Sequence, residues 1–296
     1  MNVGASTIEA IPMSKEWLRS RPFDMTLILG VTSLALCSGW VVNSWPKLFI
    51  PVLILDLWIL GYHHVVATFT RIAFDKESLQ QHKFLVFGAP LLIIAVAGTC
   101  VFIWGPWILA STYLYWQWFH YTRQSYGIAR IYQVKEDPKS LKADQAAIYL
   151  LPLAGIMYRY YQDPEIFLGI QLKCFPVPFW AFQIVFILAV FSIVSWFIKE
   201  IGLVQKGRSS LAYRLYMMCH IIIFCVGYLV LDKIDHGWLV LNVWHNAQYI
   251  LFVWMFNNKR FQQGIDPRHR FLSTISQTKN QWQYYGFCLS LSTILY

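Results

Sequence analysis

A chain of 296 residues that is 57% hydrophobic and only 13% charged is too apolar for an ordinary soluble domain, in which about a quarter of the residues are charged. Its net charge of +9 would suit a nucleic-acid-binding protein, but the basic residues lie between long apolar segments rather than in one patch. The composition therefore indicates an integral membrane protein whose partner is the lipid bilayer and not nucleic acid.

Segments of about 20 apolar residues predict membrane-spanning helices, because that length crosses about 30 Å of hydrocarbon. Such segments lie near residues 25–44, 49–72, 84–104, 107–128, 145–162, 178–198, 211–231 and 238–256. A ninth begins near Trp282 and is still apolar at Tyr296, so we expect a span that is cut short there, or alternatively a short half-embedded helix. The loops are short and no linker divides the chain. We therefore predict an all-α polytopic bundle of eight or nine spans, forming one domain over residues 1–296.

The basic residues also predict an orientation. Residues 1–24 are polar, contain Lys15, Arg19 and Arg21, and lead directly into a full-length span, which is typical of a signal anchor with a cytoplasmic N-terminus. With that orientation only four of the 24 Lys and Arg residues lie on the outer side, namely Lys47, Arg159, Lys173 and Lys233. This asymmetry follows the positive-inside rule and predicts a multi-pass protein of the cell (inner) membrane.

Five histidines fall inside the predicted spans, on four different helices: His63, His64, His120, His220 and His245. A single neutral imidazole in a span is readily explained as an interhelical hydrogen-bonding residue. Five of them favour a buried functional site, since ionisable groups in a bilayer are costly and normally face the bundle interior. Imidazoles without thiolates suit iron, copper or zinc, and the six cysteines contain no CxxC pair. We therefore predict these five histidines as metal ligands.

The depth of each histidine follows from the rise of an α-helix. At about 1.5 Å per residue, His245 lies roughly 11–12 Å from the outer boundary, His220 roughly 16 Å, His120 roughly 20 Å, and His63 and His64 roughly 22–24 Å. Two arrangements remain open. One is a single elongated polar site, and the other is a cytoplasmic-side cluster of His63, His64 and His120 with a second cluster at His220 and His245.

Polar residues share helical faces with these histidines. A continuous stripe at spacings of three and four residues contains Tyr113, Gln117, His120, Gln124 and Gly127. A second face contains Asn242, His245, Asn246 and Tyr249. In the segment 49–72, Asp56, His63 and Thr70 are predicted on one side, with His64 and Thr68 about 100° away.

These polar residues have predicted roles around a metal. Metal-bound imidazoles usually donate their second N–H to an amide, hydroxyl or carboxylate. We expect the supporting residues to be Gln117, Asn242, Asn246, Tyr249 and Thr68. We place Gln124, Asp56 and Arg123 in the catalytic group: the first two orient the ligands, and Arg123, together with Arg71, holds an acidic substrate head near the inner surface.

The stretch WFHYTRQSYG (residues 118–127), with the histidine pair of an earlier span and WHNAQY (residues 244–249) in a later one, resembles the Brp/Blh family. Members of that family are polytopic membrane β-carotene 15,15′-dioxygenases. The resemblance extends over four of the predicted helices. It implies a helical membrane fold with Fe²⁺ held by histidines among the helices.

We therefore hypothesise an iron-dependent membrane oxygenase, an oxidoreductase acting on a hydrophobic small molecule that enters from the bilayer. Two alternatives stay open. The histidines can instead form a polar or proton pathway in a transporter or channel. They can also bind haem in a membrane electron carrier, with His120 and His245 as axial ligands, or hold a different metal. The oligomeric state is not indicated by the sequence.

Overall fold

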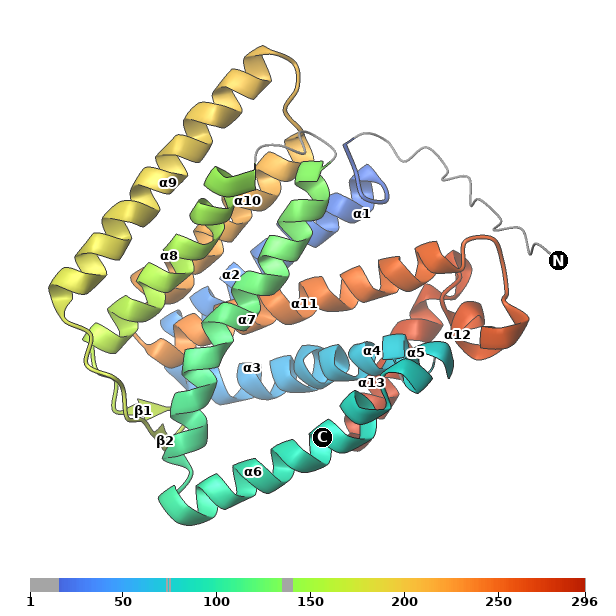
Figure 1. Cartoon of the computed structure of the whole chain (residues 1–296), viewed down its shortest axis with the longest axis horizontal. Coiled ribbons are helices and arrows are strands. Elements are labelled where there is room, and N and C mark those ends of the chain that lie inside the picture. The colour runs from blue at the N-terminus through green and yellow to red at the C-terminus, as the bar shows by residue number, and fades with distance from the viewer. Residues whose placement is uncertain (1–15, 73, 75, 135–140, 296) are drawn as a thin grey trace.

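The computed structural model describes residues 16–72, 74, 76–134 and 141–295, and this part of the chain is almost entirely helical (Figure 1). The helices are α1 (Arg21–Met25), α2 (Val31–Ser44), α3 (Phe49–Asp56), α4 (Tyr62–Ile72), α5 (Lys76–Gln81), α6 (Ala89–Trp104), α7 (Trp107–Val134), α8 (Leu141–Tyr161), α9 (Phe179–Gln205), α10 (Leu211–Cys225), α11 (Ile234–Arg260), α12 (Arg270–Ile275) and α13 (Gln281–Leu295). Each apolar segment of the sequence is helical, so the predicted all-α class is confirmed.

Single π-helical turns extend or join several of these helices. They lie at Thr26–Gly30, Leu57–Gly61, Phe84–Gly88 and Val226–Val230. Five of the resulting stretches within the described residues are long and apolar enough to cross a membrane: Arg21–Ser44, Pro46–Thr70, Phe84–Trp104, Phe179–Gln205 and Leu211–Val230. Helices α7, α8 and α11 are also long, but they carry many of the buried polar residues described below.

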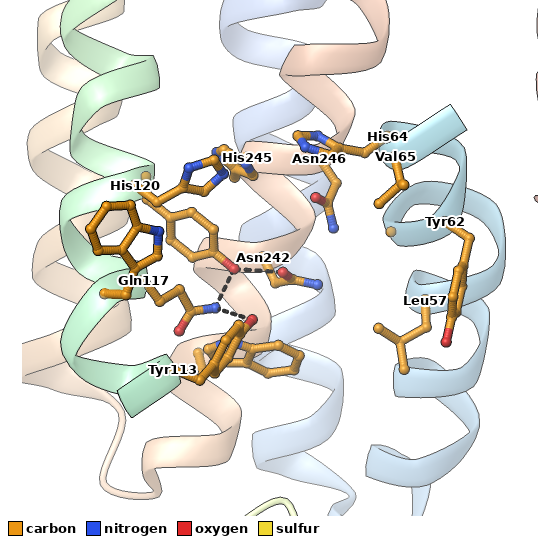
Figure 2. Close-up of a pocket in the computed structure, with 14 residues that line it drawn as sticks. Leu57, Tyr62, His64, Val65, Tyr113, Gln117, His120, Asn242, His245 and Asn246 are labelled. Carbon is orange, nitrogen blue, oxygen red and sulfur yellow. Dashed lines mark hydrogen bonds between the residues drawn. The ribbon is translucent and has the colours of Figure 1, made fainter. Parts of the chain in front are cut away.

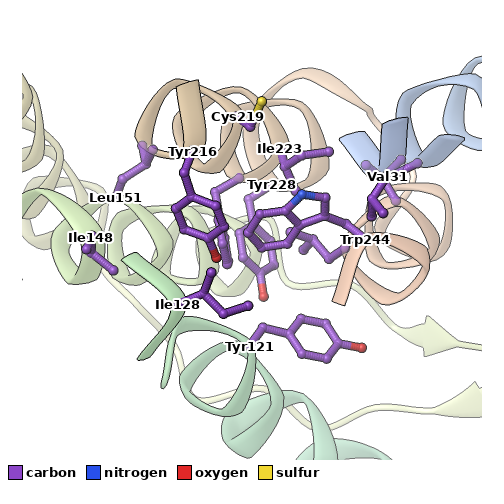
Figure 3. Close-up of a cluster of buried hydrophobic side chains, with 14 of the residues drawn as sticks. Val31, Tyr121, Ile128, Ile148, Leu151, Tyr216, Cys219, Ile223, Tyr228 and Trp244 are labelled. Carbon is purple, nitrogen blue, oxygen red and sulfur yellow. The ribbon is translucent and has the colours of Figure 1, made fainter. Parts of the chain in front are cut away.

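The core lies between α2, α7, α8, α10 and α11 and is rich in aromatic side chains (Figure 3). Trp244 is 1% exposed and donates its indole N–H to the Thr32 hydroxyl at 3.2 Å. Helix association in lipid depends on close packing and on such hydrogen bonds, because the surrounding chains are as apolar as the core. Trp244 therefore fixes the rotation of α11 against α2. The next residue, His245, lies about 100° further round and faces α4 and α7.

A short hairpin that the sequence did not predict covers one end of α7 and α11. Strands β1 (Ile166–Phe167) and β2 (Ile170–Gln171) pair antiparallel. Leu168 and Gly169 form the two-residue turn between them with φ of 49° and 79°, the left-handed geometry that such turns require. The ring of Phe167 lies 5.5 Å from that of Trp238 and 6.2 Å from that of Tyr113.

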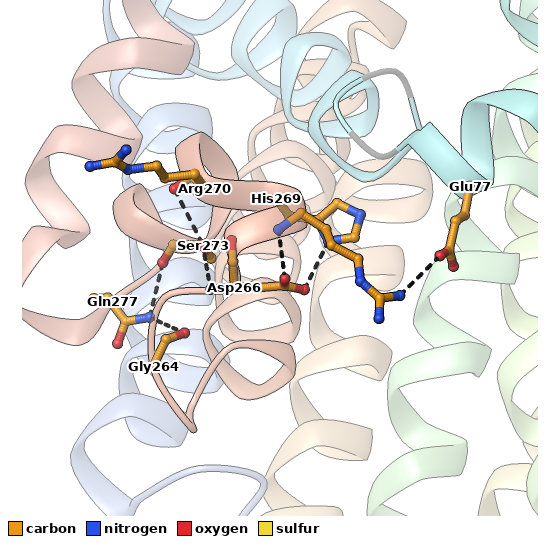
Figure 4. A network of polar contacts seen from close by, with 8 residues as sticks. Glu77, Gly264, Asp266, His269, Arg270, Ser273 and Gln277 are labelled. Carbon is orange, nitrogen blue, oxygen red and sulfur yellow. Dashed lines mark hydrogen bonds and ion pairs between the residues drawn. The ribbon is translucent and has the colours of Figure 1, made fainter. Parts of the chain in front are cut away.

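The polar loop after α11 is held by its own hydrogen bonds (Figure 4). Asp266 accepts the backbone N–H of Arg268 at 2.8 Å and lies 2.9 Å from Nδ1 of His269. The hydrogen bond from His269 holds the pKa of the Asp266 carboxyl below its usual value. The side-chain amide of Gln277 donates to three backbone carbonyls of the loop. These contacts fix α12 and lead the chain into α13, which packs on α4.

Candidate metal centre

Three imidazole rings from three helices meet in the interior: His64 from α4, His120 from α7 and His245 from α11 (Figure 2). The ring centroid of His245 lies 4.9 Å from that of His64 and 4.7 Å from that of His120. One ring nitrogen from each residue can be chosen so that all three lie within 4.8 Å of one another. Nitrogens bound to one ion at about 2 Å in tetrahedral geometry lie about 3.3 Å apart, so the rings would have to close by roughly 1–1.5 Å to hold an ion.

Two of these rings have a nitrogen that needs a partner. Nδ1 of His64 and Nδ1 of His245 are both buried, and neither has a hydrogen-bond partner in the described part of the chain. A buried polar atom without a partner costs about 1–3 kcal/mol, and such atoms are uncommon in native structures. A metal ion would satisfy a ring nitrogen as a hydrogen-bond donor does. The donor set therefore fits a cation at this position.

Several predicted supporting residues hold the rings in place. The ring of Tyr249 lies against that of His64, with centroids 4.2 Å apart, and its hydroxyl is 3.1 Å from that of Thr68. Thr68 also bonds to the backbone carbonyl of His64 at 3.2 Å. The amide of Gln124 donates to the backbone carbonyl of His245 at 2.8 Å and so links α7 to α11 beside the centre.

A chain of hydrogen bonds leads from the centre to the buried carboxyl group of Asp56. Gln117 donates to Tyr113 at 2.6 Å and to Tyr121 at 2.5 Å, and the Tyr121 hydroxyl donates to Asn242 at 2.5 Å (Figure 2). The Asn242 amide donates to Oδ2 of Asp56 at 2.6 Å, whereas Oδ1 has no partner among the described residues. Asp56 is thus linked to Tyr121 through Asn242, and Tyr121 meets His245 by ring contact.

Tyr121 is the site residue that the sequence analysis missed. Its ring lies 4.4 Å from that of His245, centroid to centroid, and it is 3% exposed. It follows Gln117 by four residues, so helical spacing from Tyr113 and Gln117 was the available signal. One tyrosine among several in an aromatic segment gave no reason to select it.

The other two predicted ligands lie elsewhere. The His63 ring faces α13, 6.1 Å from the ring of Tyr285. His220 is fully buried, with Nδ1 2.7 Å from the Ser125 hydroxyl and Nε2 3.1 Å from the carbonyl oxygen of Ile148. Both of its nitrogens therefore have protein partners, and His220 ties α10 to α7 and α8. The candidate ligand set contains neither residue.

The π-helical turn explains why His64 and not His63 reaches the centre. A π turn adds one residue to a helix and rotates everything after it by about 100°. The turn at Leu57–Gly61 separates Asp56 from the histidine pair, so Asp56 aligns with His64. His63 stays on the side of Thr70, whose hydroxyl is 3.0 Å from that of Tyr284 in α13.

The expected arrangement that separates His245 from His64 and His120 is not observed, because His245 lies beside both of them. Helix α11 begins at Ile234 rather than near residue 238, so His245 lies about 16 Å along its helix, against about 20 Å for His120 along α7. Most of the expected offset between His120 and His245 disappears with this correction.

A cavity of about 380 Å³ lies beside the three rings and is large enough for a small organic molecule. Asn246 and Gln117 contribute amides to its wall, and the remaining wall is mainly aromatic and aliphatic. Two of its lining residues, Trp116 (63% exposed) and Val65 (45% exposed), lie on the outer flanks of their helices. The cavity therefore opens sideways between α4 and α7, towards the surface that lipid would cover.

Arg123 and Gln124 lie one turn further along α7 than His120. Arg123 is exposed and donates to the Tyr149 hydroxyl at 3.1 Å. The side chain of Arg71 lies outside the described residues, so its expected role is not addressed by the structure.

Comparison of the chain with protein-family models, with curated proteins and with solved structures gives no match. The resemblance to the Brp/Blh family remains a prediction from the quoted motifs alone.

Proposed function

We propose that this protein is an integral membrane oxygenase that binds Fe²⁺ through His64, His120 and His245. The observation that carries the proposal is the convergence of three imidazoles from three helices beside a cavity that opens towards lipid. Three neutral imidazoles suit iron, copper or zinc, and the choice of iron follows the resemblance stated above. Bound Fe²⁺ would supply the binding and activation of O₂.

The chain's own side chains would prepare the site for a hydrophobic substrate. Such a molecule would enter from the bilayer past Trp116 and Val65 and lie against the aromatic wall. The hydroxyl proton of Tyr121 is held by Asn242, so the phenol oxygen keeps a fixed position beside His245. Gln124 and Tyr249 restrict the movement of the ligand helices. The apolar walls would exclude bulk water, which strengthens each polar interaction inside.

We also propose that the chain crosses the cell membrane eight or nine times with its N-terminus in the cytoplasm. Helices occur at all of the apolar segments, and α7, α8, α11 and α13 would be the spans beyond the five most apolar ones. The concentration of Lys and Arg on one side supports this orientation.

A transport function is the second candidate, and the observation that favours it is the polar chain from Tyr113 to Asp56. Polar residues within membrane helices often mark ion or proton paths. The haem alternative is less well supported, because axial ligands lie on opposite faces of a macrocycle. The rings of His120 and His245 are instead only 4.7 Å apart.

Metal analysis of the full chain in detergent, combined with an optical spectrum, tests the proposal. We expect about one ion per chain in the wild type and in His82→Ala, a loop control, and less than about 0.1 in His120→Ala and His245→Ala. Less than about 0.1 ion per wild-type chain after reconstitution with Fe²⁺ would overturn it. A Soret band would establish haem instead, and proton or solute flux in metal-free liposomes would establish transport.

A further inference from the structure

A second cavity, of about 400 Å³, adjoins the histidine centre on the side towards the C-terminal end of α7. His120 lines both this cavity and the first one, so each of them reaches one of the three candidate ligands. Residues Tyr113, Gln117 and His120 line the first cavity, and His120, Gln124 and Gly127 line the second. The polar stripe found in the sequence is thus the α7 wall of both cavities.

The second cavity combines an apolar surface with one positive charge. Ile128, Ile131 and Phe252 form apolar parts of its wall, and Arg123 is its one charged lining residue. The guanidinium donates to the neutral hydroxyl of Tyr149. No carboxylate among the described residues lies within ion-pair distance of it. A cation without an acidic partner at the mouth of an apolar cavity is suited to a ligand anion.

We propose that the second cavity binds the anionic head of a single-chain amphiphile, whose hydrocarbon chain passes His120 and occupies the first cavity. This inference rests on the proposed function for its placement of a substrate at the centre, and it names the substrate class. Arg123 follows His120 by three residues, so the head is anchored about one helical turn from the candidate metal. Both cavities lie along α7 and α11 and share His120 as a lining residue, so the proposed chain would pass from one to the other at that residue.

The test uses direct binding rather than turnover. Quenching of intrinsic tryptophan fluorescence would be followed in chelator-treated full-length protein in detergent, with oleate, oleyl alcohol, oleylamine and 1-oleoyl lysophosphatidate as probes. The variants are Arg123→Gln and, as a matched control on the same helix, Arg130→Gln. Arg130 donates to Gln133 at 3.3 Å and does not line the cavity.

We expect saturable binding of at least one anionic probe, weakened about 10- to 100-fold by Arg123→Gln and unchanged by Arg130→Gln. Oleyl alcohol should bind more weakly than the anions and be insensitive to Arg123→Gln. A preference for oleate indicates a carboxylate head, and a preference for the lysophosphatidate indicates a phosphate head. Equal binding of anions to the wild type and Arg123→Gln, or equal binding of oleyl alcohol, oleylamine and both anions to the wild type, would overturn the inference.

The outcome is separable from that of the metal analysis. If the protein binds no metal but binds oleate through Arg123, the proposed oxygenase function is wrong and the amphiphile site stands. If the protein binds metal at the three histidines but Arg123→Gln does not change the binding of the anionic probes, the metal centre stands and the proposed substrate class is wrong. The thermal unfolding midpoint of Arg123→Gln is measured alongside, and we expect it to equal that of the wild type because Arg123 is exposed.

Discussion

The ring of His64 lies 4.9 Å from that of His245, centroid to centroid, while its neighbour His63 points to α13. Two adjacent histidines on one helix thus have different surroundings. We expect His64→Phe to abolish metal binding and His63→Phe to leave it unchanged, because only the former removes a ligand nitrogen from the centre. Metal content per chain after gel filtration measures both. Retention of metal by His64→Phe, or its loss in a folded His63→Phe, would show that the ligand set is wrong.

The hydrogen-bond chain behind the centre is expected to behave as one unit. Asn242→Leu removes the donor to the Asp56 carboxyl and the acceptor of the Tyr121 hydroxyl, so it should lower the free energy of unfolding by about 1–3 kcal/mol. Asp56→Leu should have a similar effect. The double variant should lose less than the sum of the two, since neither partner is then left alone.

Unfolding in a denaturing detergent titration, followed by circular dichroism, gives the three free energies. Thr99→Val serves as the control, because its hydroxyl bonds only within α6 and is exposed. Strict additivity of the Asn242 and Asp56 substitutions would contradict a direct interaction.

The contact between Gly237 in α11 and Gly227 in the π turn after α10 leaves no room for a side chain. A Cβ on Gly237 would collide with the carbonyl oxygen of Gly227, whereas a Cβ on Gly98 in α6 meets nothing within 4 Å. We expect Gly237→Ala to destabilise the fold by more than about 2 kcal/mol, because two backbones must separate. Gly98→Ala should be neutral or stabilising by up to about 1 kcal/mol. Thermal unfolding of the two variants, side by side, checks this difference.

Cys174, in the loop between β2 and α9, should react slowly with thiol reagents. Burial, with a smaller contribution from the nearby Asp163, raises the pKa of its thiol to about 11. Relative to a thiol of ordinary pKa, this shift reduces the reactive thiolate at pH 8 by about 100-fold. In a background with the other five cysteines replaced by alanine, the rate of labelling by a maleimide should rise steadily from pH 8 to pH 10. A rate that levels off between pH 9 and pH 10, as expected for a thiol with the ordinary pKa of 9.0, would contradict the shift.

The positions of the helices could be predicted from the sequence because lipid imposes length and apolarity on a helix. The segment 84–104 begins and ends where the structure places Phe84–Trp104. The stripe through His120 on α7 was also predictable, since α7 is regular and its spacing translates directly into a face. The ends of the helices were predicted less accurately. Helix α11 starts earlier and α7 ends later than the apolar segments indicated, because polar residues extend both helices beyond those segments.

The composition of the site depended on features that the sequence does not signal. The π turn at Leu57–Gly61 consists of ordinary apolar residues and a glycine, yet it decides which histidine of the pair enters the centre. His220 has the same residue type and apolar context as His245. Only the tertiary arrangement shows that Ser125 and Ile148 satisfy His220, while Nδ1 of His245 has no partner among the described residues. Helical periodicity could not anticipate either result.

The three helices that carry the candidate ligands are far apart in the sequence, and this spacing sets the order in which the three rings become available. His64 and His120 are synthesised early, but the third ring becomes available only after α11 has left the ribosome. Metal loading at this centre would therefore follow insertion of most of the chain, and it would join α4, α7 and α11 as a late cross-link. The ion would then bind only to chains in which all three helices are assembled, and it would stabilise that state. The supply of metal to the cell would therefore influence how much of the protein escapes degradation.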